Sequence, residues 1–199
     1  EDITDEKGRP YRNVSAYSQI VEGDVEKAFA EADAIVEMEY RTPRWHQTYM
    51  EPNSCTARLH PDGRITLWTS CHGEFVVRDA VAATLKIPPD RIRVVALEMG
   101  GGFGGKNGPF TRAHAVCLTM RTGRPVKMLM SREEEFLDGH PAPGCFIRLK
   151  TAGKKDGRIT ALEGRVVWDR GHSGGPGQAD RLIGPYKIPN IKLEGFGVR

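Results

Sequence analysis

The segment of this sequence with the most unusual chemistry is glycine-rich and runs from Glu98 to Pro109. Five of the six residues from 100 to 105 are glycines, and the sixth is Phe103. Glycine tolerates positive φ and leaves its backbone N–H groups accessible, so such a run can bring amide donors against an oxyanion. Because ordering many glycines is costly and an aromatic residue lies among them, we interpret the segment as a ligand-binding loop with one fixed conformation.

Two nucleotide-binding patterns also match this loop. Three of its glycines satisfy G-x-G-x-x-G, but in that fingerprint the third glycine lies within a helix, whereas Pro109 follows Gly105 closely and delays any helix. The run from Gly100 to Lys106 meets most of the P-loop pattern, yet Asn107 stands where Ser or Thr must bind Mg²⁺. Nucleotide binding is therefore the less favoured alternative, to be tested by NAD or ATP binding.

The elements around the loop can be predicted from hydrophobic spacing. The spacing predicts a strand at Arg91–Leu97, before the loop. It also predicts a helix at Arg112–Arg121, after the loop, with Gly123 as its C-terminal stop. The same reasoning predicts further helices at 25–33 and 74–85 and strands at 17–21, 35–40, 55–60, 64–70, 125–130, 146–151, 158–169 and 187–196. The acidic run 133–135 reads as a solvated helix start. The expected class is α+β, with mixed, mainly antiparallel sheets and a few helices.

Composition and charge exclude several functional classes. The chain has 199 residues, 29 Lys and Arg against 26 Asp and Glu, and a formal net charge of +3. Because the two signs are interspersed, no long-range field favours nucleic acid or an anionic membrane. No apolar run approaches the roughly 20 residues of a membrane span, and the acidic start is unlike a signal or transit peptide. We expect a cytoplasmic protein that binds neither nucleic acid nor membrane.

Cysteine spacing and the chain ends give two further expectations. There is no CxxC pair and no clustered histidine to complete a zinc set, so we expect no metal site formed by side chains and free thiols at Cys55, Cys71, Cys117 and Cys145. The chain begins without Met and stops soon after a Gly-Phe-Gly string. We therefore expect it to be a piece of a longer protein.

The string GGGFGGK at 100–106 resembles the large molybdenum-binding subunit of the xanthine dehydrogenase and aldehyde oxidase family. Other stretches are similar to that family in the same order, namely Gly23–Phe29, Met50–Pro52, Trp68–Ser70, Pro125–Lys127, Ser131–Phe136, Asp156–Leu162 and Tyr186–Asn190. The resemblance covers nearly the whole chain. It implies a fold of the molybdenum cofactor-binding domain type, with residues 1–22 as a lead-in segment and 23–199 as the incomplete N-terminal part of a molybdopterin-binding domain.

The resemblance also implies an activity and partners for the full-length subunit. Such an enzyme is a molybdenum hydroxylase that oxidises an aldehyde or N-heteroaromatic substrate, with water as the oxygen source, and passes electrons to Fe-S and FAD subunits or domains. Its cofactor is molybdopterin, either plain or as the cytosine dinucleotide. The implied partners are a small-molecule substrate, these redox subunits and the remainder of the large subunit. A homodimer is a further expectation, because a truncated domain exposes apolar surface.

Cofactor-binding residues can be carried over position by position. In the family, the Gly-Phe-Gly backbone amides face the oxygen ligands of molybdenum, which implies roles for Gly101, Gly102, Phe103 and Gly104. His72 occupies the slot where the family has a Gln that donates to the same ligands. A histidine can still donate through a ring N–H, with a different reach. This substitution also leaves open a non-catalytic scaffold or interaction domain derived from the family.

Substrate-binding residues are carried over in the same way. Asn107 lies where purine-oxidising relatives have a Glu, which favours aldehyde or N-heterocycle oxidation over purine oxidation. Arg181 is the nearest candidate for a substrate-orienting Arg, although its spacing to Tyr186 is short. We expect Glu51 and Lys106 to be structural. The family's general-base Glu and its Arg-Gly-Phe-Gly segment lie further downstream, so no catalytic residue is expected in this fragment and the isolated chain should be inactive.

Overall fold

The structure is a computed structural model that describes residues 13–173 and 175–199. Two compact units divide the chain: the first is formed by the described residues up to Arg44 together with Pro143–Arg199, and the second by Trp45–Ala142. The second unit contains the glycine-rich loop. In the sequence, the second unit lies between the two segments that form the first unit.

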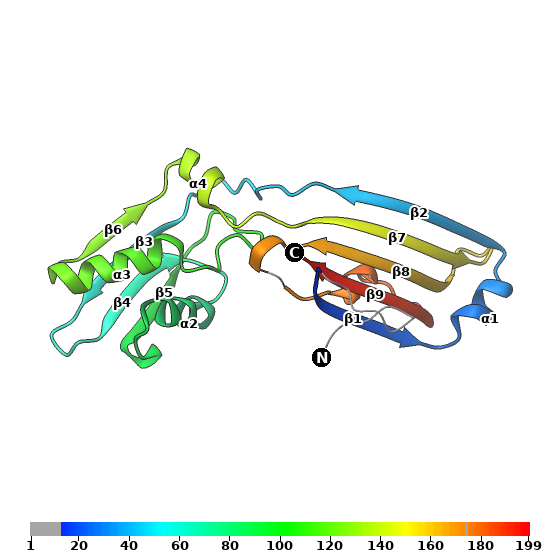
Figure 1. The fold of residues 1–199 in the computed structure, drawn as a ribbon, viewed down its shortest axis with the longest axis horizontal. Helices are drawn as coiled ribbons and strands as arrows, with labels where there is room; N and C mark the ends of the chain where they lie inside the picture. Colours follow the sequence, from blue (N-terminus) through cyan, green and yellow to red (C-terminus); the bar gives the residue numbers. More distant parts are fainter. Residues whose placement is uncertain (1–12, 174) are drawn as a thin grey trace. The chain divides into compact units, whose positions relative to one another are not determined.

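The first unit is built on a five-stranded sheet with the order β1-β9-β8-β7-β2 (Figure 1). All neighbouring strands are antiparallel except the parallel pair of β8 and β9. Its elements are β1 (Val14–Glu22), α1 (Val25–Ala30), β2 (Ala34–Thr42), β7 (Gly144–Gly153), β8 (Ile159–Asp169), η2 (Gly171–Ser173), η3 (Ala179–Leu182) and β9 (Asn190–Val198).

Helix α1 shows how local sequence sets its bounds. Asp24 caps its first turn by accepting the Lys27 amide at 2.9 Å. Val25 and Ala28 then pack against Ala152 and Ala161 of the sheet. The helix ends at Ala30, three residues before the predicted end, because the chain has turned by Asp33, whose amide donates to Gly153 and starts the pairing of β2 with β7.

The second unit is a four-stranded sheet with the order β5-β4-β3-β6 (Figure 1). Its strands β3 and β4 form the predicted hairpin, in which the His60 amide donates to Arg64 O at 2.8 Å. The elements are β3 (Ser54–Leu59), β4 (Ile65–Ser70), α2 (Glu74–Leu85), η1 (Pro89–Arg91), β5 (Ile92–Leu97), α3 (Phe110–Thr122), β6 (Val126–Leu129) and α4 (Arg132–Asp138).

The core of the second unit lies between its sheet and helices α2 and α3. Residues from both helices and from β3, β4 and β5 share one buried apolar cluster, so the two helices cover the same face of the sheet. Strands β4 and β5 are parallel, and α2 supplies the crossover that a parallel pair needs. The predicted class of mixed, mainly antiparallel sheets with a few helices is confirmed. Within the described residues, no helix combines the length and the apolar character needed to span a membrane.

Candidate functional site

The parallel pairing of β4 and β5 places the glycine-rich loop beside His72. Ser70 and Leu97, the last residues of the two strands, are register partners. Both strands therefore end at the same edge of the sheet, where β4 continues into His72 and β5 continues into the loop. Ligands of open sheets with parallel strands are commonly held at the carboxyl ends of those strands. The loop ends where α3 begins at Phe110, after Pro109. No glycine of the run 100–105 therefore lies within the helix, in contrast to the dinucleotide-binding fingerprint.

His72 contacts the loop backbone directly. The Gly104 amide donates to Nε2 of His72 at 3.5 Å, the long end of the hydrogen-bond range. A Cβ added at Gly102 would lie 2.8 Å from the same nitrogen and 2.9 Å from the Met99 sulfur, so only glycine permits this approach. Three of the residues that the resemblance selected are thus brought together within one unit.

The backbone of the loop is tightly turned at its centre. Gly101 has φ +92°, Phe103 has φ +47° and Gly104 has φ +89°, and the Gly105 amide donates to Gly102 O at 2.7 Å. In the part of the chain that the structure describes, no protein atom accepts a hydrogen bond from the amide of Gly102 or Phe103. Backbone donors in such a turn can bind an anionic ligand. The exposed Phe103 ring does not fill a core.

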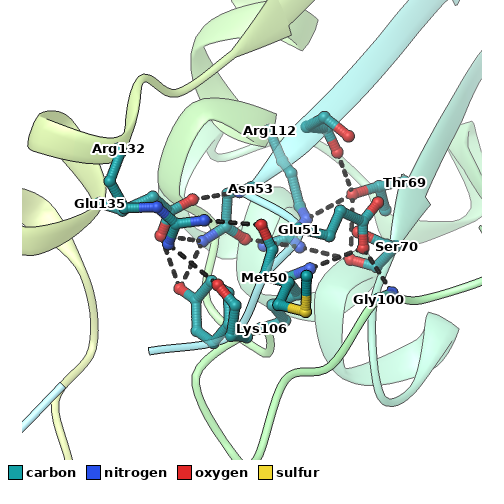
Figure 2. Close-up of polar contacts among 12 residues, drawn as sticks. Met50, Glu51, Asn53, Thr69, Ser70, Gly100, Lys106, Arg112, Arg132 and Glu135 are labelled. Carbon is teal, nitrogen blue, oxygen red and sulfur yellow. Dashed lines mark hydrogen bonds and ion pairs between the residues drawn. The ribbon is translucent and has the colours of Figure 1, made fainter. Parts of the chain in front are cut away.

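One carboxylate holds both ends of the run 100–106 within the loop. Oε2 of Glu51 accepts the Gly100 amide at 2.8 Å and the Lys106 ammonium at 2.7 Å (Figure 2). Lys106 is fully buried, with its Nζ 4.8 Å from the centre of the Tyr49 ring. Burial by itself raises the pKa of Glu51, but the hydrogen bonds from Lys106 and Gly100 and the Lys106 charge outweigh it and lower that pKa. Glu51 is therefore ionised at neutral pH.

Helix α4 supports the segment that carries Glu51. Arg132 donates to the carbonyl oxygens of Tyr49 at 2.9 Å and Met50 at 2.6 Å (Figure 2). The helix starts with a capping box, in which Ser131 accepts the Glu134 amide and Glu134 accepts the Ser131 amide. These contacts fix the backbone on the N-terminal side of Glu51.

The expectation that the acidic run 133–135 is solvated is wrong for Glu135. Its side chain is fully buried and accepts the Tyr49 hydroxyl at 2.6 Å, the Asn53 side-chain amide at 3.1 Å and the Asn53 backbone amide. Burial, followed by the hydrogen bond to Glu135 and its charge, raises the pKa of Tyr49, so the phenol stays protonated and donates. The sequence pattern showed a helix start but not that one of its acids faces inward.

Sequence reasoning also missed Arg112, which is fully buried at the start of α3. It donates to Thr69 Oγ1 at 2.8 Å, Gly108 O at 2.7 Å, Ser70 O at 2.7 Å and Asn53 Oδ1 at 3.2 Å (Figure 2). Burial lowers its pKa from the ordinary arginine value. A signal existed in the sequence, because residues 112, 116 and 119 share one face of a helix, and all three are fully buried.

The two residues predicted to bind substrate lie in different units. Asn107 lies in the last part of the loop in the second unit, and its Oδ1 is buried without a hydrogen-bond partner among the described residues. Arg181 lies on η3 of the first unit, where its side chain is exposed and its Nε is 3.9 Å from Asp180 Oδ2. The cofactor-facing residues predicted from the sequence are therefore a cluster within one unit, and Arg181 does not belong to that unit.

Comparisons with known proteins agree with the resemblance found in the sequence. A family model described as a molybdopterin cofactor-binding domain matches residues 6–199. A probable xanthine dehydrogenase subunit of Bacillus subtilis (strain 168) is 34% identical over an alignment of 182 residues that covers 88% of this chain and 24% of that protein. The nicotinate dehydrogenase large molybdopterin subunit of Eubacterium barkeri is 32% identical over 188 residues, covering 92% of this chain and 44% of that protein.

Solved structures show the same relationship. The aldehyde oxidoreductase from Desulfovibrio gigas matches with a TM-score of 0.76 and 30% identity, over 97% of this chain and 22% of that chain. This chain thus spans less than half of the length of each of these three proteins. The resemblance to relatives of xanthine dehydrogenase and aldehyde oxidase is confirmed, and the chain belongs to the family of molybdopterin cofactor-binding domains.

Proposed function

We propose that this chain forms the part of a molybdenum hydroxylase large subunit that holds molybdopterin, and that the whole protein oxidises an aldehyde or N-heteroaromatic substrate with water as the oxygen source. The family match supports the cofactor. The printed names of the relatives, which include a nicotinate dehydrogenase and an aldehyde oxidoreductase, support the substrate classes. Because the chain spans only a part of these relatives, activity is a property of the whole protein.

The observation that carries the proposal is the set of free amide donors in the loop. Molybdopterin, when bound, supplies a redox-active molybdenum centre with anionic oxygen ligands. The amides of Gly102 and Phe103 would donate to such oxygens, since no protein acceptor competes for them within the described residues. His72 would act beside them through its ring, next to Gly104. Donors already held in place by the fold require no reorganisation when the anion binds.

Asn107 supports the choice of substrate class. Its side-chain oxygen is buried and lacks a hydrogen-bond partner among the described residues, so its capacity as an acceptor is unused. A neutral amide can accept an N–H of a heterocycle or donate to a carbonyl oxygen, but it cannot pair with a cation as a carboxylate does. We propose Asn107 as a substrate-binding residue. Arg181 remains a second proposed substrate residue on the basis of the family resemblance.

The redox partners follow from the same proposal. Fe-S and FAD subunits or domains would accept the electrons that are removed from the substrate. The remainder of the large subunit would supply the general base and the rest of the pocket. A cytosine dinucleotide form of the cofactor, a cytoplasmic location and a homodimer are further parts of the proposal.

The test compares two glycine substitutions in the full-length protein. Gly102→Ala places a methyl group against His72, whereas Gly153→Ala in β7 meets no atom closer than 3.5 Å. We expect Gly102→Ala to lose most of the bound molybdenum and about 100-fold in turnover, as expected when reacting groups are misplaced by about 1 Å. Gly153→Ala should retain both.

Two other outcomes would support the competing hypotheses. Full-length protein that contains no molybdenum after expression with the cofactor would favour the scaffold hypothesis. Saturable binding of NAD or ATP by the protein, abolished by Gly102→Ala, would favour nucleotide binding. Equal molybdenum content and turnover in the two alanine variants would exclude the assignment of the loop.

A further inference from the structure

The guanidinium of Arg112 joins two separate stretches of backbone. Its Nε and one terminal nitrogen bind Thr69 Oγ1 and Ser70 O, at the end of β4 (Figure 2). Its other terminal nitrogen binds Gly108 O, four residues earlier in the chain and directly before Pro109. Ser70 lies two residues before His72, and Gly108 lies near the end of the loop, directly after Asn107. One rigid group therefore bridges the backbone that leads to His72 and the backbone that leaves the loop.

The planar shape of the guanidinium matters for this bridge. Its donors point in fixed directions in one plane, so satisfying four acceptors at 2.7–3.2 Å sets the positions of those acceptors relative to one another. A lysine ammonium carries the same charge on a flexible stem and cannot reach acceptors so far apart in one plane. The geometry, rather than the charge alone, distinguishes Arg112 from a simple cation.

The side-chain amide of Asn53 connects Arg112 to a negatively charged partner, Glu135. Asn53 accepts from Arg112 through Oδ1 and donates to Glu135 through Nδ2 at 3.1 Å, so the amide lies between the buried cation and the buried anion. A buried charge is tolerated only when such contacts satisfy it. This arrangement anchors the guanidinium to α4, independently of the two stretches of backbone that it bridges.

We infer that Arg112 is a positioning residue that sets the separation between His72 and the loop backbone at 102–104, and so shapes the molybdenum site without touching the cofactor. The inference rests on the proposed function of the loop. Three observations carry it: full burial, hydrogen bonds to both flanking stretches, and anchoring to Glu135 through Asn53.

The experiment uses full-length protein with Arg112→Lys, Arg112→Met and a matched control, Thr119→Val. Thr119 is equally buried on the same helix and donates to Ala57 O and Arg124 O, both at 3.0 Å, away from the loop. The readouts are molybdenum content, the molybdenum(V) paramagnetic resonance signal, kcat and KM, the thermal midpoint, and hydrogen–deuterium exchange of peptides covering 71–73 and 98–109.

We expect Thr119→Val to lower the thermal midpoint while leaving the resonance signal and kcat unchanged. Arg112→Lys should alter the resonance signal, lower kcat about 10-fold or more with little change in KM, and raise exchange in both peptides. If Arg112→Met fails to fold, Arg112→Lys decides the result.

The inference is overturned if Arg112→Lys and Thr119→Val give the same exchange in both peptides and the same resonance signal. Exchange does not depend on the cofactor. Protein that holds no molybdenum would therefore refute the proposed function, while the exchange of the two peptides would still decide the role of Arg112.

Discussion

Oε2 of Glu51 lies 2.7 Å from Nζ of Lys106 and 2.8 Å from the Gly100 amide, so a single oxygen closes the glycine-rich loop on itself. The loop contains five glycines in six positions, and each costs conformational entropy to order. Holding both ends at one point reduces the number of conformations that remain. This contact explains how a glycine-rich segment presents its amides in one arrangement.

The first prediction concerns this ion pair. Lys106→Met leaves Glu51 without its cation in a partly buried site and should cost about 2–4 kcal/mol of stability. Lys27→Met is the control, because its contact with Glu31 is 4.0 Å long and exposed, and its loss should cost less than about 0.5 kcal/mol. Equilibrium unfolding in urea measures both. Equal effects of the two variants would contradict a structural role for the buried pair.

The second prediction is a pH dependence that follows from Glu51. Its pKa is lower in the folded protein than its ordinary value of 4.5, so its ionised form stabilises the fold above that value. This contribution is lost as the pH falls below about 4.5 and through the folded pKa. The difference in stability between the parent protein and Glu51→Gln should therefore become smaller as the pH falls through this range. Thermal unfolding of both proteins from about pH 7 to about pH 3 measures this difference.

Comparing the parent protein with Glu51→Gln isolates the contribution of the Glu51 carboxyl group. Asp62 and Asp156 also have lowered pKa values, because the amides and side chains of Arg64 and Arg158 bind them. Both are present in the parent and in Glu51→Gln, so their contributions cancel in the difference. A stability difference that stays constant with pH would show that Glu51 does not titrate in this way.

The third prediction concerns the hydroxyl of Tyr49. Tyr49→Phe removes a donor from buried Glu135 and an acceptor from Asn53, and should destabilise the protein by about 1–3 kcal/mol. Tyr17→Phe removes a similar bond to Glu194 at an exposed position, where water can replace it, and should have a smaller effect. The two thermal midpoints measure the difference. A larger loss in Tyr17→Phe would refute the account of the buried network.

The fourth prediction concerns His72. Its Nε2 accepts the Gly104 amide, whereas a glutamine at this position always offers an N–H donor to an anionic ligand. His72→Gln in the full-length protein should therefore retain molybdenum and raise molybdenum-dependent turnover, measured with aldehyde and N-heterocycle substrates. Turnover that does not change would support the scaffold hypothesis.

Much of the fold follows from local sequence. The hairpin at 60–64, the cap at Asp24 and the αL stop at Gly123 are decided by residues close together in the chain, and the structure confirms all three. The loop itself could be predicted because five glycines in six positions, with Phe103 among them, favour a ligand-binding loop with one conformation over a flexible linker. The contact of His72 with the loop, by contrast, joins two strand ends, so it could be anticipated only through the family pattern and not from spacing.

The sequence by itself therefore determined the class of fold, the elements and the segment that presents amide donors. Only the tertiary structure decided which charged residues are buried around it. Asn53 and Glu135 are separated by 82 positions, and Arg112 and Thr69 by 43, so their contacts depend on how strands and helices pack. A helical pattern marks which face is apolar, but whether an Arg or Glu on that face is buried depends on partners far away in the chain, because a charge enters a core only where other groups satisfy it.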